Sequence, residues 1–82
     1  MQISSVTHIR NYRLAIEFDD DSTKTIDLEK YIRNSDSPVI EEYLDIDLFC
    51  EVYLNELGSL CWGDNEMVIT NESILSGEFD VI

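Results

Sequence analysis

The sequence predicts a small α+β domain, in which an antiparallel sheet (a three-stranded meander plus a second hairpin) packs with two or three short helices. Two observations lead to this prediction. Apolar and polar side chains alternate along the first third of the chain, which is typical of strands with one buried face. Helix-capping residues then precede short apolar clusters in the middle of the chain. We expect residues 1–82 to form a single domain.

Three strands are predicted at the beginning of the chain. Residues 3–9 are rich in β-branched side chains, and Asn11 offers a turn. Residues 12–18 alternate with a period of two, residues 19–22 are turn formers, and the alternation resumes over residues 23–28. This order predicts a three-stranded antiparallel meander.

The next segment is predicted to be helical. Residues 28–32 can form one helical turn. Ser37 as N-cap, with Pro38 at the first helical position, predicts a helix start, and Asp45 predicts a second N-cap. Glu41 and Glu42 suit the positive N-terminal end of the helix dipole. The second helix is expected to bury an apolar stripe made of Leu48, Phe49 and Val52.

A second hairpin is predicted around the turn at residues 55–58, where Gly58 can take a positive φ. If Val52 and Leu54 face the core with Leu60 and Trp62, Cys61 must point the other way. If Cys50 belongs to the strand, it lies on the face opposite Cys61, and the two cysteines cannot form a disulfide. We therefore expect two free thiols, packed as small apolar residues.

The remaining residues predict a loop and a last helical turn. Residues 63–65 form the loop, and residues 67–69 are a short apolar run. Thr70 or Asn71 would cap a helical turn that Gly77 ends. Residues 78–82 fit either a strand or a frayed tail.

The charge is strongly negative and unevenly placed. Five basic residues face eighteen acidic ones, for a formal charge of −13, and this excludes a general nucleic-acid binder. All five basic residues lie within the first 33 positions, and twelve acidic residues follow without a Lys or Arg. A segment whose charged residues are all acidic attracts a basic partner. The same charge is also explained by a need for solubility alone. Because neither a membrane span nor a signal peptide is evident, we expect a cytoplasmic protein with no membrane partner.

One short segment is the candidate partner-binding site. Asp64, Asn65 and Glu66 form an acidic loop that could bind Arg or Lys of a partner. The preceding Trp62 is either an interface anchor or a core residue, and the small size of the domain favours the core.

No catalytic residue, cofactor site or metal site is predicted. Residues 19–21 lack the spacing of a calcium loop, so we interpret them as a solvated turn. His8 is the only histidine, and neither Cys50 nor Cys61 lies in a protease signature. We interpret His8 as a strand residue with an exposed ring and expect a protein that is not an enzyme.

Four segments carry a resemblance to a known family. They are residues 12–20 (YRLAIEFDD), 25–28 (TIDL), 47–52 (DLFCEV) and 58–62 (GSLCW). In this pattern the chain resembles a bacterial family, domain of unknown function 2442. It departs from the family at residues 63–65, Gly-Asp-Asn where many members read Pro-Asn-Gly, and at Asp21, where members often have Gly.

The resemblance implies an α+β fold like the N-terminal domain that precedes a DNA-binding helix-turn-helix in longer members. It implies no established activity. Stand-alone members resemble one half of two-gene modules, which implies an antitoxin-like role.

Three hypotheses follow. The first is a non-enzymatic interaction module that binds a basic protein. The second is an acidic nucleic-acid mimic, or a regulator of a DNA-binding protein. The third is a small-molecule binder, which requires a concave pocket with converging polar groups. A homodimer formed through a sheet edge is compatible with each of them.

Overall fold

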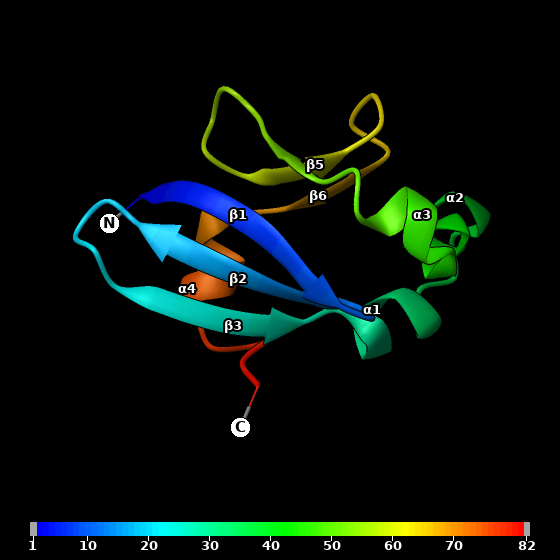
Figure 1. Ribbon diagram of the computed structural model, residues 1–82. Helices are drawn as coiled ribbons and strands as arrows, with labels where there is room; N and C mark the ends of the chain where they lie inside the picture. Colours follow the sequence, from blue (N-terminus) through cyan, green and yellow to red (C-terminus); the bar gives the residue numbers. More distant parts are fainter. Residues whose placement is uncertain (1, 82) are drawn as a thin grey trace.

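The fold of residues 2–81, which the computed structural model describes, consists of two antiparallel sheets joined by short helices (Figure 1). This confirms the predicted α+β class. The first sheet has the order β1-β2-β3 and the second has the order β4-β5-β6. The strands are β1 (Ile3–Arg10), β2 (Arg13–Phe18), β3 (Thr23–Asp27), β4 (Tyr53–Leu54), β5 (Leu60–Trp62) and β6 (Met67–Ile69). The helices are α1 (Glu29–Arg33), α2 (Pro38–Glu41), the 3-10 turn η1 (Glu42–Leu44), α3 (Ile46–Phe49) and α4 (Asn71–Leu75).

The first sheet is the predicted meander. Leu14, Ile16 and Phe18 are buried on one face of β2, as the period of two requires. Asn11 takes a positive φ at the turn from β1 to β2. Two register shifts interrupt β1, between Ile3 and Ser5 and between His8 and Arg10, so the edge strand is bulged at both ends.

The caps of the short helices also follow the prediction. The Ser37 side chain accepts a hydrogen bond from the Ile40 backbone N–H, and Asp45 accepts one from that of Asp47. Thr70, rather than Asn71, caps α4 by accepting from the Ser73 N–H.

The predicted apolar stripe of α3 is wrong in part. Phe49 is buried, but Leu48 is exposed and Val52 lies beyond the end of the helix, which stops after one turn. A helix this short has only one face against the core, so the residue next to Phe49 points to solvent.

The second hairpin is confirmed and extended. Leu54 pairs with Leu60 across the hairpin, and β6 adds a third strand through the pairing of Trp62 with Met67. Three residues are too few to display a period, which is why the run at residues 67–69 did not predict a strand.

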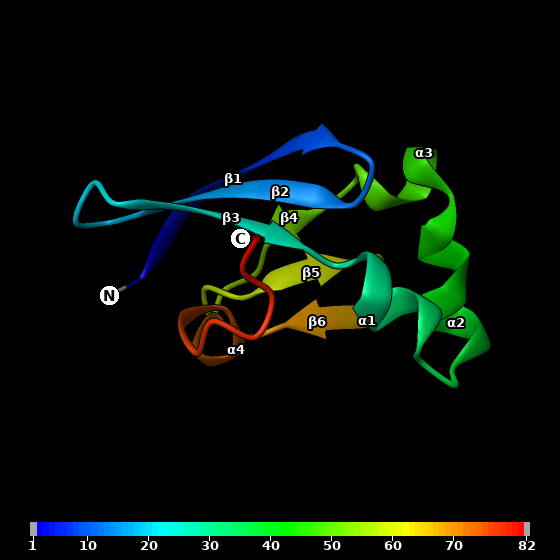
Figure 2. The same cartoon turned by 90° about the horizontal axis from the view of Figure 1, so that it is seen from below.

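The hydrophobic core lies between the two sheets, with α1–α3 at one end and α4 toward the other (Figure 2). Its largest fully buried side chains are Trp62 and Phe49. Within residues 2–81, no helix is long and apolar enough to cross a membrane.

The C-terminal segment docks on the free edge of β3. The Asp27 N–H donates to the Phe79 carbonyl (3.0 Å), and the Val81 N–H donates to the Thr25 carbonyl (3.2 Å). Asp80 forms an isolated bridge with Ile26. Residues 78–81 are therefore ordered against the sheet, while the last residue of the predicted strand or tail, Ile82, lies outside the described residues.

Candidate functional site: an acidic end

Trp62 belongs to the core. Its side chain is 0% exposed, and its indole N–H donates to the Phe49 carbonyl (2.7 Å). Its ring lies 5.6 Å from that of Phe49 and 6.3 Å from that of Tyr43, centre to centre. This burial matches the favoured interpretation of Trp62, and it leaves the turn after it as the exposed part of the predicted site.

That turn, residues 63–66, holds Asp64, Asn65 and Glu66 at the surface. Gly63 and Asn65 both take positive φ values, 61° and 60°, so the chain reverses tightly between β5 and β6. The Glu66 N–H donates to the Trp62 carbonyl (3.1 Å), and the Tyr53 hydroxyl donates to the Gly63 carbonyl (2.7 Å). The acidic loop is therefore held in place from both sides.

Tyr43 connects this turn to the helical segment. Its hydroxyl donates to the Glu66 carboxylate (2.9 Å), and the two residues are 23 positions apart in the sequence. Burial, the hydrogen bond to Glu66 and the charges of Glu66, Glu42 and Glu51 raise the pKa of Tyr43 to about 12. The phenol of Tyr43 thus contacts one carboxylate, that of Glu66, and is influenced by the charges of two others.

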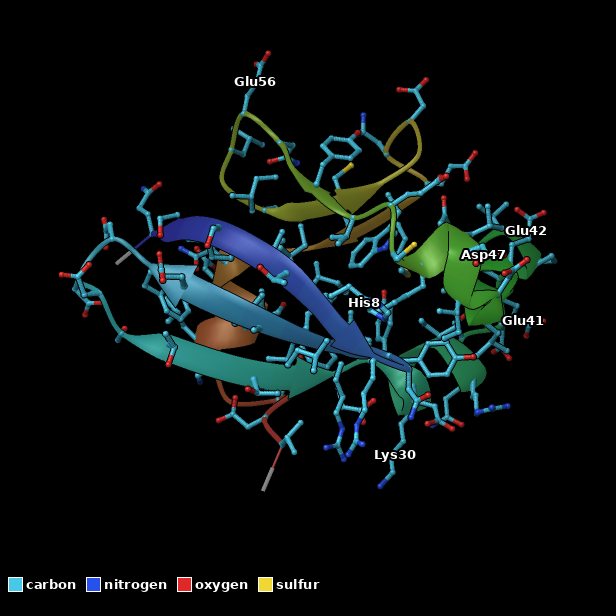
Figure 3. All side chains as sticks on the ribbon, in the orientation of Figure 1. His8, Lys30, Glu41, Glu42, Asp47 and Glu56 are labelled. Atoms are coloured by element: carbon cyan, nitrogen blue, oxygen red, sulfur yellow. The ribbon has the colours of Figure 1, made fainter. Side chains whose placement is uncertain are left out.

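These carboxylates define a surface that we call the acidic end. Glu41, Glu42 and Asp47 gather there at the tip of α2, η1 and α3 (Figure 3). The acidic end comprises Glu41, Glu42, Asp45, Asp47, Glu51, Asp64 and Glu66, all of them exposed.

The acidic end has no counter-charge of its own. The ion pairs found among residues 2–81 are Arg13–Asp27, Lys24–Asp80 and Arg33–Glu29, and none of them involves an acidic-end residue. The chain has no Lys or Arg after Arg33, so the elements that carry the acidic end supply no cation of their own.

The two cysteines lie next to the acidic segments: the Cys50 thiol donates to the Asp47 carbonyl (3.3 Å), and the Cys61 thiol donates to the Asn65 side-chain oxygen (3.4 Å). Both cysteines are free thiols, as predicted. Cys61 is buried, and its thiol donates a hydrogen bond to the Tyr53 hydroxyl oxygen (3.2 Å). Cys50 is not in a strand and is not packed: it follows α3 and is exposed, because that helix ends before β4 begins.

His8 is half-buried rather than exposed. Its Nε2 atom lies 2.8 Å from the Asn11 carbonyl, and its ring packs edge-on against Phe49. Among residues 2–81, no group of three or more His, Cys, Asp and Glu side chains is arranged to hold a metal ion.

The sequence pointed to the acidic turn but missed the tyrosine that completes the site. Nothing near Tyr43 in the sequence indicates that it meets Glu66, because the contact depends on how η1 packs beside the second sheet. For the acidic end as a whole, the sequence did hold a signal, which is that no Lys or Arg follows Arg33.

Fold and site together define a small α+β domain with an uncompensated acidic end and a buried tryptophan behind it. The sequence pattern of the family described as "Protein of unknown function (DUF2442)" matches residues 3–80, nearly the whole chain. The protein belongs to this family. In the corresponding comparisons, no curated protein and no solved structure matched the chain.

Proposed function

We propose that the protein is a non-enzymatic interaction domain of the cytoplasm that binds a basic protein through its acidic end. The observation that carries the proposal is the set of exposed carboxylates at the acidic end, none of which forms an ion pair with a Lys or Arg of residues 2–81. Unpaired carboxylates of one sign steer a cationic partner and suppress the binding of anionic ones.

Exposed apolar side chains support a protein partner rather than a small cation. Val39, Ile46 and Leu48 are 42%, 36% and 37% exposed, and they lie on α2 and α3 among the acidic residues. Protein interfaces combine an apolar centre with a polar rim. The surface therefore suits a basic segment that also carries apolar residues.

The form of this binding that the family resemblance suggests is neutralisation of a basic toxin by an acidic antitoxin. The acidic end would then cover a cationic surface of the toxin. The alternative, nucleic-acid mimicry, is the outcome to expect if the partner is a DNA-binding protein that DNA displaces from the acidic end.

The test is affinity capture from native cytoplasm at low and at high salt, followed by identification of the retained proteins. We compare the wild type with the triple variant Glu42→Gln, Glu51→Gln and Glu66→Gln. The control variant Glu17→Gln, Glu56→Gln and Glu72→Gln loses the same charge at exposed positions outside the acidic end.

The wild type and the control variant should retain a basic protein, and high salt should release it. The acidic-end variant should retain several-fold less. Equal retention by all three proteins, or retention of acidic proteins only, contradicts the proposal.

A further inference from the structure

A pocket of about 570 Å³ opens where α1, the end of β3 and the C-terminal segment meet. It is lined by five residues between positions 27 and 35 and by residues 78–81, whereas the acidic end is drawn from the segments 41–51 and 63–66. Lys30, at its rim, projects away from Glu42 and Asp47 (Figure 3). The size falls within the ~300–1,000 Å³ of small-molecule sites.

Two aromatic rings give the pocket an apolar surface. Tyr31 and Phe79 both line it, and their rings meet edge to face with centres 5.6 Å apart. Phe79 is held there by the hydrogen bond from the Asp27 N–H to its carbonyl. The apolar surface is therefore built by two segments far apart in the sequence and fixed by the docked C-terminal segment.

Two of the three carboxylates at the pocket are already occupied. Asp27 accepts from Arg13 (3.2 Å) and from the Glu29 N–H (2.9 Å), and Asp80 pairs with Lys24 (3.0 Å). These bonds neutralise both groups and leave them with structural roles.

The other two charged groups at the pocket are Lys30 and Glu78. Neither side chain forms an ion pair with a described residue. The pocket thus offers one cation and one anion beside an aromatic surface.

We propose that this pocket binds a small zwitterion that carries an apolar side chain, either a free α-amino acid or a short peptide. Lys30 takes the ligand carboxylate and Glu78 takes its ammonium group. The ligand side chain lies against Tyr31 and Phe79. The inference is independent of the proposed interaction function, because no acidic-end residue takes part.

The test is a titration of ¹⁵N-labelled protein, followed by the shifts of its backbone amide signals. The probes are L-phenylalanine and the dipeptide phenylalanyl-phenylalanine, which distinguish the two ligand sources. N-acetyl-phenylalanine and phenylalanine amide each lack one of the two ligand charges.

Either zwitterion should shift the amides of residues 30–35 and 78–81 at millimolar concentration, since the pocket is open to solvent. Each blocked probe should bind several-fold more weakly. Lys30→Gln should weaken L-phenylalanine about two- to fivefold, as expected for an exposed ion pair, but leave phenylalanine amide unchanged. Glu78→Gln removes the partner of the ligand ammonium group, so it should weaken the binding of L-phenylalanine to a similar degree and leave the binding of N-acetyl-phenylalanine unchanged.

Arg10→Gln and Glu56→Gln are the matched controls, because they make the same charge changes at exposed residues outside the pocket. They should bind as the wild type does. No shift at millimolar concentration, shifts confined to other residues, or equal binding of free and blocked probes would overturn the proposal. Binding of only one of the two zwitterions supports it and identifies the source.

Discussion

At the scale of single residues, Trp62 and Tyr43 show two ways in which a buried aromatic side chain satisfies its polar group. Trp62 fills the core and satisfies the Phe49 carbonyl with its indole N–H. Tyr43 packs its ring on that core and directs its hydroxyl to Glu66 at the surface. The polar tip of a buried aromatic residue needs such a partner, so the position of Glu66 is tied to the packing beneath it.

Tyr43 should make stability depend on alkaline pH. In the unfolded chain its phenol ionises near pH 10, whereas in the folded protein its pKa is raised to about 12. The folded state therefore holds the proton over this interval, and the free energy of unfolding should fall as pH rises from about 10 to 12. Below pH 10 this contribution is fully present.

Urea unfolding measured over this pH range tests the effect. Tyr43→Phe removes the ionising group and should make the pH dependence shallower. An identical dependence in the wild type and the variant would show that Tyr43 does not titrate differently in the two states.

At the scale of elements, tight turns and caps rather than long helices or strands define this fold. The turn from β5 to β6 depends on Gly63, whose φ is 61°. A Cβ at this position would lie 2.9 Å from the Tyr43 hydroxyl oxygen and 3.0 Å from the Glu66 carboxylate. The absence of a Cβ at position 63 is thus required both by the turn and by the contact between Tyr43 and Glu66.

Gly63→Ala should therefore cost more than Gly58→Ala, its matched control. Both place alanine at positive φ, which costs roughly 1–2 kcal/mol. At Gly58 the nearest atom is 3.4 Å from the added Cβ, an ordinary contact. We expect the free energy of unfolding to fall by an amount near that range for Gly58→Ala and by a larger amount for Gly63→Ala, as measured by urea unfolding.

The excess loss at Gly63 should shrink in a Tyr43→Phe background, because the hydroxyl that the Cβ meets is gone. Equal losses at the two glycines would mean that the turn yields without disturbing Tyr43.

Elements whose signals are local could be predicted from the sequence. The alternation in β2, the Ser37 and Asp45 caps and the turn at Gly58 each act within a few residues. The pairing of β6 with β5 and the docking of Phe79 on β3 are contacts between distant segments, and the sequence left both undecided. The acidic turn of the candidate site could be predicted because its signal is local. Its link to Tyr43 was missed because that contact joins segments far apart in the sequence.

At the scale of the whole molecule, charge is distributed unequally between the two halves of the chain. The bonds Arg13–Asp27, Lys24–Asp80 and Arg33–Glu29 use three of the five basic residues. The acidic end retains its repulsion, which opposes the compact state. A basic partner would relieve this repulsion on binding.

Sodium chloride should therefore raise the melting temperature of the isolated protein, because it screens repulsion among exposed carboxylates. The Glu42→Gln, Glu51→Gln, Glu66→Gln variant should be more stable at low salt and less sensitive to added salt. The Glu17→Gln, Glu56→Gln, Glu72→Gln variant should change less, and thermal unfolding followed by circular dichroism gives the comparison. A melting temperature that salt leaves unchanged in all three proteins would refute this account of the repulsion.

The docked residues 78–81 also cover an edge of the first sheet. They occupy the outer edge of β3, a strand with two threonines and one isoleucine, by donating to and accepting from its backbone. Released from that position, they would leave a bare row of amide and carbonyl groups to which strands of other molecules could add in succession. This short segment therefore does more than complete a sheet, since it removes one of the strand edges at which another molecule could pair.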